Sequence, residues 1–152
     1  PEGPEFVLWQ HREHRVSITE TDINNVLRAK SAIYAGLSLL ITEVGLTLDD
    51  VDRFYIAGGF GRHLNIEKGI LIGLFPDRPR EQFAYLGNTS AAGAYLCLLS
   101  QSLRQQAEAI AGQMTTIELS VSGRFMDEYV AGLFLPHTNM ALFPSVAKIQ
   151  PK

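Results

Sequence analysis

Two segments of the chain have residue types suited to holding a ligand that must approach the backbone closely. Each is a short apolar run that enters a glycine. Residues 54–57 lead into Gly58-Gly59-Phe60-Gly61, and residues 83–86 lead into Gly87-Asn88. Glycine adopts positive φ and leaves room for a ligand at contact distance. Because ligands commonly bind at the carboxyl ends of strands in α/β sheets, both segments are candidate binding loops.

The second segment continues into a run of small residues, 89–94, that is typical of a closely packed helix. The amino terminus of a helix offers free N–H groups and partial positive charge, and Asn88 is placed to cap it. Neither loop is a Walker A sequence, and Gly59-Phe60-Gly61 is not a full dinucleotide fingerprint, since position 64 is leucine. Ordinary tight turns therefore remain an alternative for each loop.

The elements around these loops alternate between strand and helix patterns. The strongest helix signal begins at Thr19-Glu20-Thr21-Asp22, which resembles a capping box, and continues with apolar residues at helical spacing until Gly45. The remaining patterns predict strands at 7–9, 16–18, 54–57, 83–86 and 116–120. They also predict helices at 66–74, 89–103 and 125–133, with a further helix that follows residue 103 and runs to about residue 114. Such alternation favours an α/β layered domain.

Composition excludes several classes of function. The 152 residues carry 13 basic and 16 acidic side chains, a net charge of −3, with no basic run, so nucleic acid is not an expected partner. No apolar stretch is long enough to predict a membrane span. Cys97, the single cysteine, cannot form an internal disulfide or hold an iron–sulfur cluster, and we expect a buried thiol in a cytoplasmic protein.

The order of these motifs resembles the second half of the acetate/sugar kinase, Hsp70 and actin superfamily. More narrowly, residues 6–146 resemble the C-terminal domain of the reductive activators of corrinoid proteins. The motifs that carry this resemblance are Ile18-Thr19-x-x-Asp22-Ile23, Ala29-Lys30, residues 56–61, Ile72-Gly73-Leu74-Phe75-Pro76 and Phe134-Leu135-Pro136-His137. The resemblance implies an α/β fold, namely an RNase H-like, actin-like ATPase half with a mixed sheet flanked by helices.

The resemblance also implies a function for a longer parent protein. Its N-terminal domain would carry a [2Fe-2S] cluster, and its C-terminal domain would bind ATP or ADP with Mg²⁺. Together they would reduce the Co(II) corrinoid protein of a methyltransferase system to Co(I). In this chain, the resemblance places nucleotide contacts at Gly58, Gly59, Phe60, Gly61, Lys30, Gly87 and Asn88. The phosphate and Mg²⁺ segments of the family have no counterpart here, so no catalytic residue or metal ligand is assigned.

Each of these assignments has a simpler alternative. Lys30 is also explained as a solvated helix lysine and Phe60 as a core residue, while Arg62 and His63 are expected at the surface. The whole chain is also explained as a non-catalytic protein-binding or dimerisation module of the same fold, and homodimerisation is left open. A kinase fragment is a third, weaker alternative.

The chain is expected to divide into three parts. Residues 1–6 read as a remnant of a tag and cloning site, residues 7–146 as the domain, and residues 147–152 as a tail. His137 is expected to make a structural contact in the tail region. The acidic pair Asp127-Glu128 is expected to be solvated.

Overall fold

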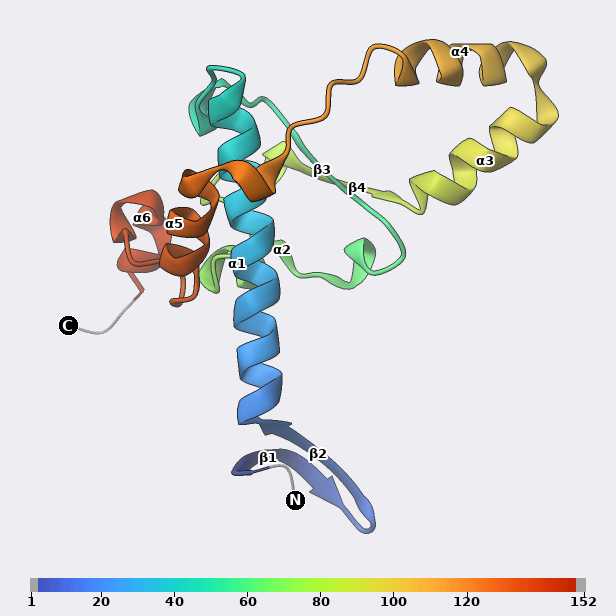
Figure 1. The fold of residues 1–152 in the computed structure, drawn as a ribbon. Helices are drawn as coiled ribbons and strands as arrows, with labels where there is room; N and C mark the ends of the chain where they lie inside the picture. The colour runs from blue at the N-terminus through green and yellow to red at the C-terminus, as the bar shows by residue number, and fades with distance from the viewer. Residues whose placement is uncertain (1–2, 150–152) are drawn as a thin grey trace.

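A long helix organises the fold. The computed structural model describes residues 3–149, and its central element is α1, Glu20–Glu43. An antiparallel hairpin of β1, Glu5–His11, and β2, His14–Thr19, projects from the amino-terminal end of α1 (Figure 1). The first two residues of β1, Glu5 and Phe6, pair with Thr19 and Ile18 of β2.

The start of α1 follows the predicted capping box. The Thr19 Oγ1 atom accepts a hydrogen bond from the Asp22 backbone N–H at 3.1 Å, and the Asp22 carboxylate accepts one from the Thr19 N–H at 2.9 Å. The bond from the Thr19 N–H lowers the pKa of Asp22, and a hydrogen bond from the Thr19 hydroxyl to the same carboxylate, at 2.8 Å, adds to that effect. The helix ends at the C-cap Val44, and Gly45 follows with a φ of 75°, the left-handed conformation that glycine adopts without strain.

The candidate loops follow a small parallel sheet. It consists of β3, Phe54–Ala57, and β4, Phe83–Gly87, with the short helix α2, Ile66–Leu71, in the crossover between them. The α/β class is confirmed. Within residues 3–149, however, the strands form two separate pairs, one antiparallel and one parallel.

Two local predictions are wrong. Residues 116–120 form no strand, and Leu119–Val121 is a 3-10 helix instead. Leu119 packs against α1, 3.6 Å from where a Cβ on Gly36 would lie, so the alternating pattern reflects contact with a helix rather than with a neighbouring strand. The helix predicted for 89–103 is broken at Ser100, which is extended and whose hydroxyl accepts from the Leu103 N–H at 3.3 Å.

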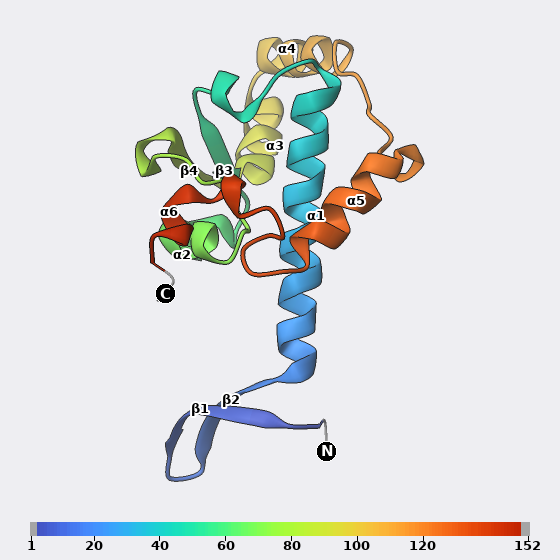
Figure 2. The same ribbon diagram turned by 90° about the vertical axis from the view of Figure 1, so that its left-hand side faces the viewer.

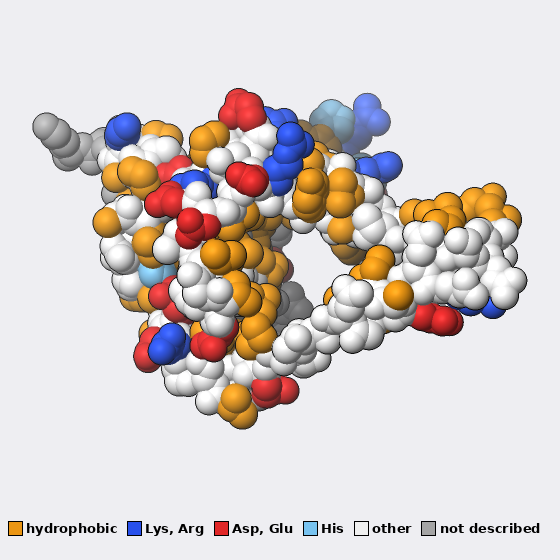
Figure 3. All heavy atoms as spheres, turned by 90° about the horizontal axis from the view of Figure 1, so that it is seen from above, with side chains coloured by type: hydrophobic (Ala, Val, Ile, Leu, Met, Phe, Trp, Pro, Cys, Tyr) orange, Lys and Arg blue, Asp and Glu red, His pale blue; other side chains and the backbone are white. Residues whose placement is uncertain are grey.

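That break creates an arm of two helices, α3, Thr89–Leu99, and α4, Gln101–Ala111 (Figure 1). The space-filling view shows an opening between this arm and the body of the molecule, bordered by hydrophobic side chains (Figure 3). Every residue of α3 is exposed except Cys97, which is half-buried. The expectation of a buried thiol is therefore wrong, because α3 packs mainly on α4 and not on the core.

The last two α-helices pack on the body of the molecule. Helix α5, Gly123–Gly132, lies against α1, and α6, Pro144–Ala147, lies on the side of α2 (Figure 2). The buried core joins these helices to the parallel sheet through Tyr34, Phe54, Ile66, Ile70, Phe83, Phe143 and Val146.

Five 3-10 helices complete the described elements: η1, Leu48–Asp50; η2, Gly61–His63; η3, Arg80–Gln82; η4, Leu119–Val121; and η5, Met140–Leu142. The predicted tail includes residues 150–152, which lie outside the described range. Among residues 3–149, no helix combines the length and the hydrophobicity that a membrane crossing requires.

Candidate functional site

The two glycine loops meet at the carboxyl ends of β3 and β4. The Gly58 N–H donates a hydrogen bond of 2.7 Å to the Gly87 carbonyl, which joins one loop directly to the other. Parallel pairing brings both strands to the same edge of the sheet. Two segments that lie almost thirty residues apart in the chain therefore form one surface.

The glycines of these loops are required for different reasons. Gly58 and Gly87 have φ values of 100° and 70°, where a side chain would be strained. Gly61 is needed for packing, because a Cβ there would lie 2.8 Å from the Ile56 Cγ2 atom. Gly59 has neither constraint: its φ is not in the left-handed region, and nothing lies within 4 Å of its Cβ position. The fold therefore gives no reason for the missing side chain at Gly59.

Phe60 stands beside this open glycine. Its side chain is 87% exposed, so the alternative that it belongs to the core is wrong. An aromatic ring left in solvent costs free energy that contact with an apolar ligand face would recover. Its contact with adenine stays a prediction.

Asn88 performs the capping role that its sequence position predicts. Its Oδ1 atom accepts a hydrogen bond from the Ala91 N–H at 3.1 Å, at the start of α3. Capping satisfies one of the free donors at the helix amino terminus. Because Asn88 directly follows Gly87, this cap fixes the direction in which α3 leaves the glycine loop.

Lys30 is a buried lysine on α1. It is 1% exposed, so the solvated alternative is wrong. Its Nζ atom donates to the Phe134 carbonyl and, at 2.6 Å, to the Pro136 carbonyl. Burial lowers the pKa of Lys30 to about 8, while the two carbonyls favour the charged form. An ammonium has three donors, so a nucleotide contact would have to use the third.

No pattern in the sequence indicates the polar cluster that surrounds Lys30. His137 is 5% exposed, and its Nδ1 atom accepts a hydrogen bond from the Asn139 N–H at 3.0 Å. The ring is therefore neutral with its proton on Nε2, which lies 3.6 Å from the Glu128 Oε2 atom. The expectation that His137 makes a structural contact is confirmed. Glu128 is solvated only in part, because its side chain is 36% exposed while its Oε2 atom is buried.

Burial, together with neighbouring charges, shifts two pKa values in this cluster. Burial lowers the pKa of His137, and the charge of Lys30 adds to that effect, while Glu128 opposes it. Burial also raises the pKa of Tyr34 to about 12, with further contributions from the charges of Glu128 and Asp77. In the sequence, only the Leu-Pro-His motif distinguishes this region. That motif does not predict that Lys30 is buried beside it.

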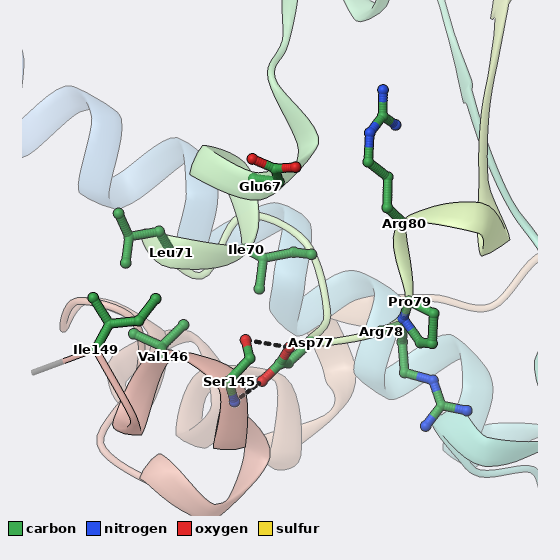
Figure 4. Close-up of a pocket in the computed structure, with 10 residues that line it drawn as sticks. All are labelled: Glu67, Ile70, Leu71, Asp77, Arg78, Pro79, Arg80, Ser145, Val146 and Ile149. Atoms are coloured by element: carbon green, nitrogen blue, oxygen red, sulfur yellow. Dashed lines mark hydrogen bonds between the residues drawn. The ribbon is translucent and has the colours of Figure 1, made fainter.

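Two cavities are lined in part by α2, and neither includes a glycine of the loops. One of about 330 Å³ is lined by Arg62, His63, Tyr85 and neighbouring residues of η2 and α2. Arg62 and His63 are exposed, as predicted. The other, of about 540 Å³, has an apolar floor that includes Ile70 and Val146, and a polar rim (Figure 4). In that rim the Asp77 carboxylate is already occupied by hydrogen bonds from the N–H and hydroxyl of Ser145.

Comparison with known proteins agrees with the fold. Residues 1–147 match the family described as the C-terminal domain of RACo, the ASKHA domain. The chain belongs to this family. A solved structure, "Reductive activator for corrinoid,iron-sulfur protein", matches 95% of the chain with a TM-score of 0.89 and 48% identity, and the match covers 24% of that protein. The actin-like fold class is therefore confirmed for this ASKHA domain.

Two curated relatives carry related descriptions. "Corrinoid activation enzyme RamQ" of Eubacterium limosum is 32% identical over 130 residues, which are 86% of this chain and 20% of the relative. "[Co(II) methylated amine-specific corrinoid protein] reductase" of Methanosarcina barkeri is 28% identical over 120 residues, 78% of this chain and 22% of the relative. This ASKHA domain thus spans about a fifth of the length of the curated relatives that it matches.

Proposed function

We propose that this domain is the adenosine-binding part of an ATP-dependent reductive activator that converts a Co(II) corrinoid protein to Co(I). The observation that carries the proposal is the joined pair of glycine loops, with open space at Gly59. The names of the relatives support the role of the longer protein. The [2Fe-2S] cluster that supplies the electron belongs to that longer protein, which we place in the cytoplasm.

The residues at the loops suit an adenosine group. The open position at Gly59 leaves room for a sugar or base to lie against the backbone. The exposed ring of Phe60 supplies an apolar face for the adenine. The N–H groups at the start of α3 favour negative charge. When bound, ATP with Mg²⁺ would supply binding and hydrolysis energy, and this chain's own residues position the adenosine.

Nucleotide acts on the reaction through the difference in its affinity between two states of the activator. A ligand shifts an equilibrium only as far as that difference allows. We infer that binding at the glycine loops changes how the activator engages the corrinoid protein. The test mixes the full-length activator, corrinoid protein and reductant with and without ATP and follows Co(I) by its absorbance. Equal Co(I) yield under both conditions would sink this role.

Binding by the domain itself is tested by thermal unfolding with and without millimolar Mg-ADP. A ligand at about 100 times its Kd stabilises by roughly 2.7 kcal/mol, a shift of about 5–10 °C for a domain of this size. The Gly59→Val variant should lose the shift while its own unfolding temperature stays close to that of the wild type. If the isolated domain shows no shift, the same unfolding measurement is made on the full-length activator. Comparing its wild type with its Gly59→Val variant then decides whether the loop binds nucleotide.

A second candidate function is a protein-binding module that no longer uses nucleotide. The exposed apolar side chains of α3 favour it, with Leu98 78% and Leu99 67% exposed. This candidate predicts no effect of Gly59→Val on Co(I) yield in the full-length protein. The adenosine proposal predicts a loss, so one variant separates the two.

A further inference from the structure

A polar cavity lies in the connection between β3 and β4. Its volume of about 330 Å³ is within the range of small-molecule sites. It is lined by Arg62 and His63 of η2 and by Arg80, the first residue of η3. Tyr85 of β4 also lines it. Polar side chains from three separate elements therefore meet at one cavity.

The two arginines bring positive charge that the protein itself does not neutralise. Among the described residues, no carboxylate forms an ion pair with Arg62 or Arg80. Arg78 differs from Arg80, because its guanidinium forms an ion pair with Asp49. Figure 4 shows the Arg78 and Arg80 side chains leaving the chain in opposite directions. Of these two neighbouring arginines, only Arg80, which has no ion pair in the described part of the chain, lines the cavity.

Two hydrogen bonds hold the lining of the cavity together. The Tyr85 hydroxyl donates to the Leu64 carbonyl, which ties β4 to the residue directly after η2. The Arg62 Nε atom donates to the His63 Nε2 atom at 3.3 Å. This bond uses one of the five guanidinium N–H donors and leaves four for a ligand. Because Nε2 accepts, the His63 ring carries its proton on Nδ1, which is a further donor.

These donors suit a phosphate group better than a carboxylate. A guanidinium binds an oxyanion through two parallel N–H groups. A carboxylate has a single pair of oxygens, which one arginine occupies, whereas a phosphate group has three free oxygens and can accept from two arginines. The charge of a phosphate monoester, about −1.5 to −2 at pH 7, also matches two arginines. Glu67 lines the same cavity, and its charge opposes an anion.

We propose that this cavity is a phosphate-binding site in which Arg62 and Arg80 bind the phosphate oxygens. The phosphate has two sources of the same chemistry. One is a separate phosphorylated small molecule. The other is the nucleotide at the glycine loops, since Arg62 directly follows Gly61, and this source alone rests on the proposed function. The site itself does not depend on adenosine binding, because neither arginine belongs to the loops.

Protection of the arginines from a dicarbonyl reagent tests the site in the full-length activator. Peptide mass spectrometry follows each arginine in inorganic phosphate, or in chloride at the same ionic strength, without nucleotide. Once phosphate reaches about ten times its Kd, modification of Arg62 and Arg80 should slow about tenfold, and that of Arg78 should not change. Equal rates at Arg62 and Arg80 in millimolar phosphate and in chloride would overturn the proposal.

Three variants separate this site from a general attraction of anions. Arg80→Gln should raise the Kd of phosphate, read from the protection of Arg62, at least about tenfold, because it removes charge-assisted hydrogen bonds. Arg78→Gln removes the same charge two residues away, outside the cavity, and should leave that Kd unchanged. Glu67→Gln should lower it about threefold, since it removes a like charge. An unchanged Kd in Arg80→Gln, or an equal rise in Arg78→Gln, would reject the site.

Nucleotide then identifies the source of the phosphate. If Mg-ADP protects Arg62 and Arg80 and adenosine does not, the phosphate belongs to the nucleotide. If inorganic phosphate protects them and Mg-ADP does not, the ligand is a separate phosphorylated molecule. Either result retains the site. Failure of adenosine binding leaves the phosphate titration unaffected, because that titration contains no nucleotide.

Discussion

Glycine serves opposite purposes in two regions of this domain. In the region packed on α1, a Cβ on Gly73 would lie 2.1 Å from the Pro136 carbonyl oxygen, and one on Gly132 would lie 2.8 Å from the Ser31 hydroxyl. At the ends of β3 and β4, no atom lies within 4 Å of the Cβ positions of Gly58, Gly59 or Gly87. In the first region, the absence of a side chain allows neighbouring segments to pack closely. In the second region, it leaves the space beside the backbone unoccupied. The difference separates the residues that hold the fold from those free to meet a ligand.

The largest expected effect is at Gly73. Its φ of 78° is unfavourable for any side chain, and Gly73→Ala would force a methyl group into the backbone at Pro136. We expect a loss of about 3 kcal/mol or more in the free energy of unfolding, measured by denaturant titration. A wild-type midpoint in Gly73→Ala would show that the C-terminal segment is not packed as described.

Gly59→Ala should show the converse behaviour in the open region. Its methyl group has free space, so the free energy of unfolding should change by less than about 0.5 kcal/mol. Affinity for Mg-ADP should fall at least about tenfold, because a methyl group at the surface of contact keeps the ligand away. Calorimetry on the same samples reports both quantities. If Gly59→Ala lost as much stability as affinity for Mg-ADP, the two regions would not differ in the way described.

The closed region should also respond to pH. Burial lowers the folded-state pKa of His137 below the usual value of 6.5, so the unfolded chain binds the proton more readily. Stability should therefore fall as the pH drops below about 6.5, and the fall should level off once the pH is below the folded-state pKa. The slope, from denaturant titrations between pH 7.5 and 5, should be smaller in His137→Gln. The groups that face this ring are Glu128 on α5, and Lys30 and Tyr34 on α1.

Two helix caps give the smallest and most finely matched comparison. Asn65 caps α2 through the Lys68 N–H at 2.9 Å, much as Asn88 caps α3. Each change to alanine should cost about 1 kcal/mol of stability. Only Asn88→Ala should also weaken Mg-ADP binding, since Asn88 follows the glycine loop. Similar ligand affinities in the two variants would place the nucleotide elsewhere.

Local signals in the sequence were sufficient for the loops and the first helix. The capping box at Thr19 and the paired strand-glycine segments depend on neighbouring residues, so their pattern is visible in the chain itself. The environment of Lys30 could not be read that way, because its partners lie more than a hundred residues away. The same holds for the buried Oε2 atom of Glu128, which lies beside His137, a residue outside its own helix.

Long-range packing also explains the wrong strand at 116–120. Alternation predicts a half-buried surface, but it does not say whether a strand or a helix covers that surface. Leu119 found α1. The open position of Gly59 could not be predicted from the sequence either, because it depends on which residues do not pack against it.

The hydrogen bond from Gly58 to Gly87 has a mechanical consequence. It ties the first glycine loop to the residue immediately before Asn88, where α3 begins. An 11-residue helix is about 16 Å long, so a tilt of about 10° at its base displaces its far end by about 3 Å. Helix α3 is thus a lever whose fulcrum is the glycine loop, and a small movement of the backbone at Gly58 would become a displacement of side-chain size at Ser100.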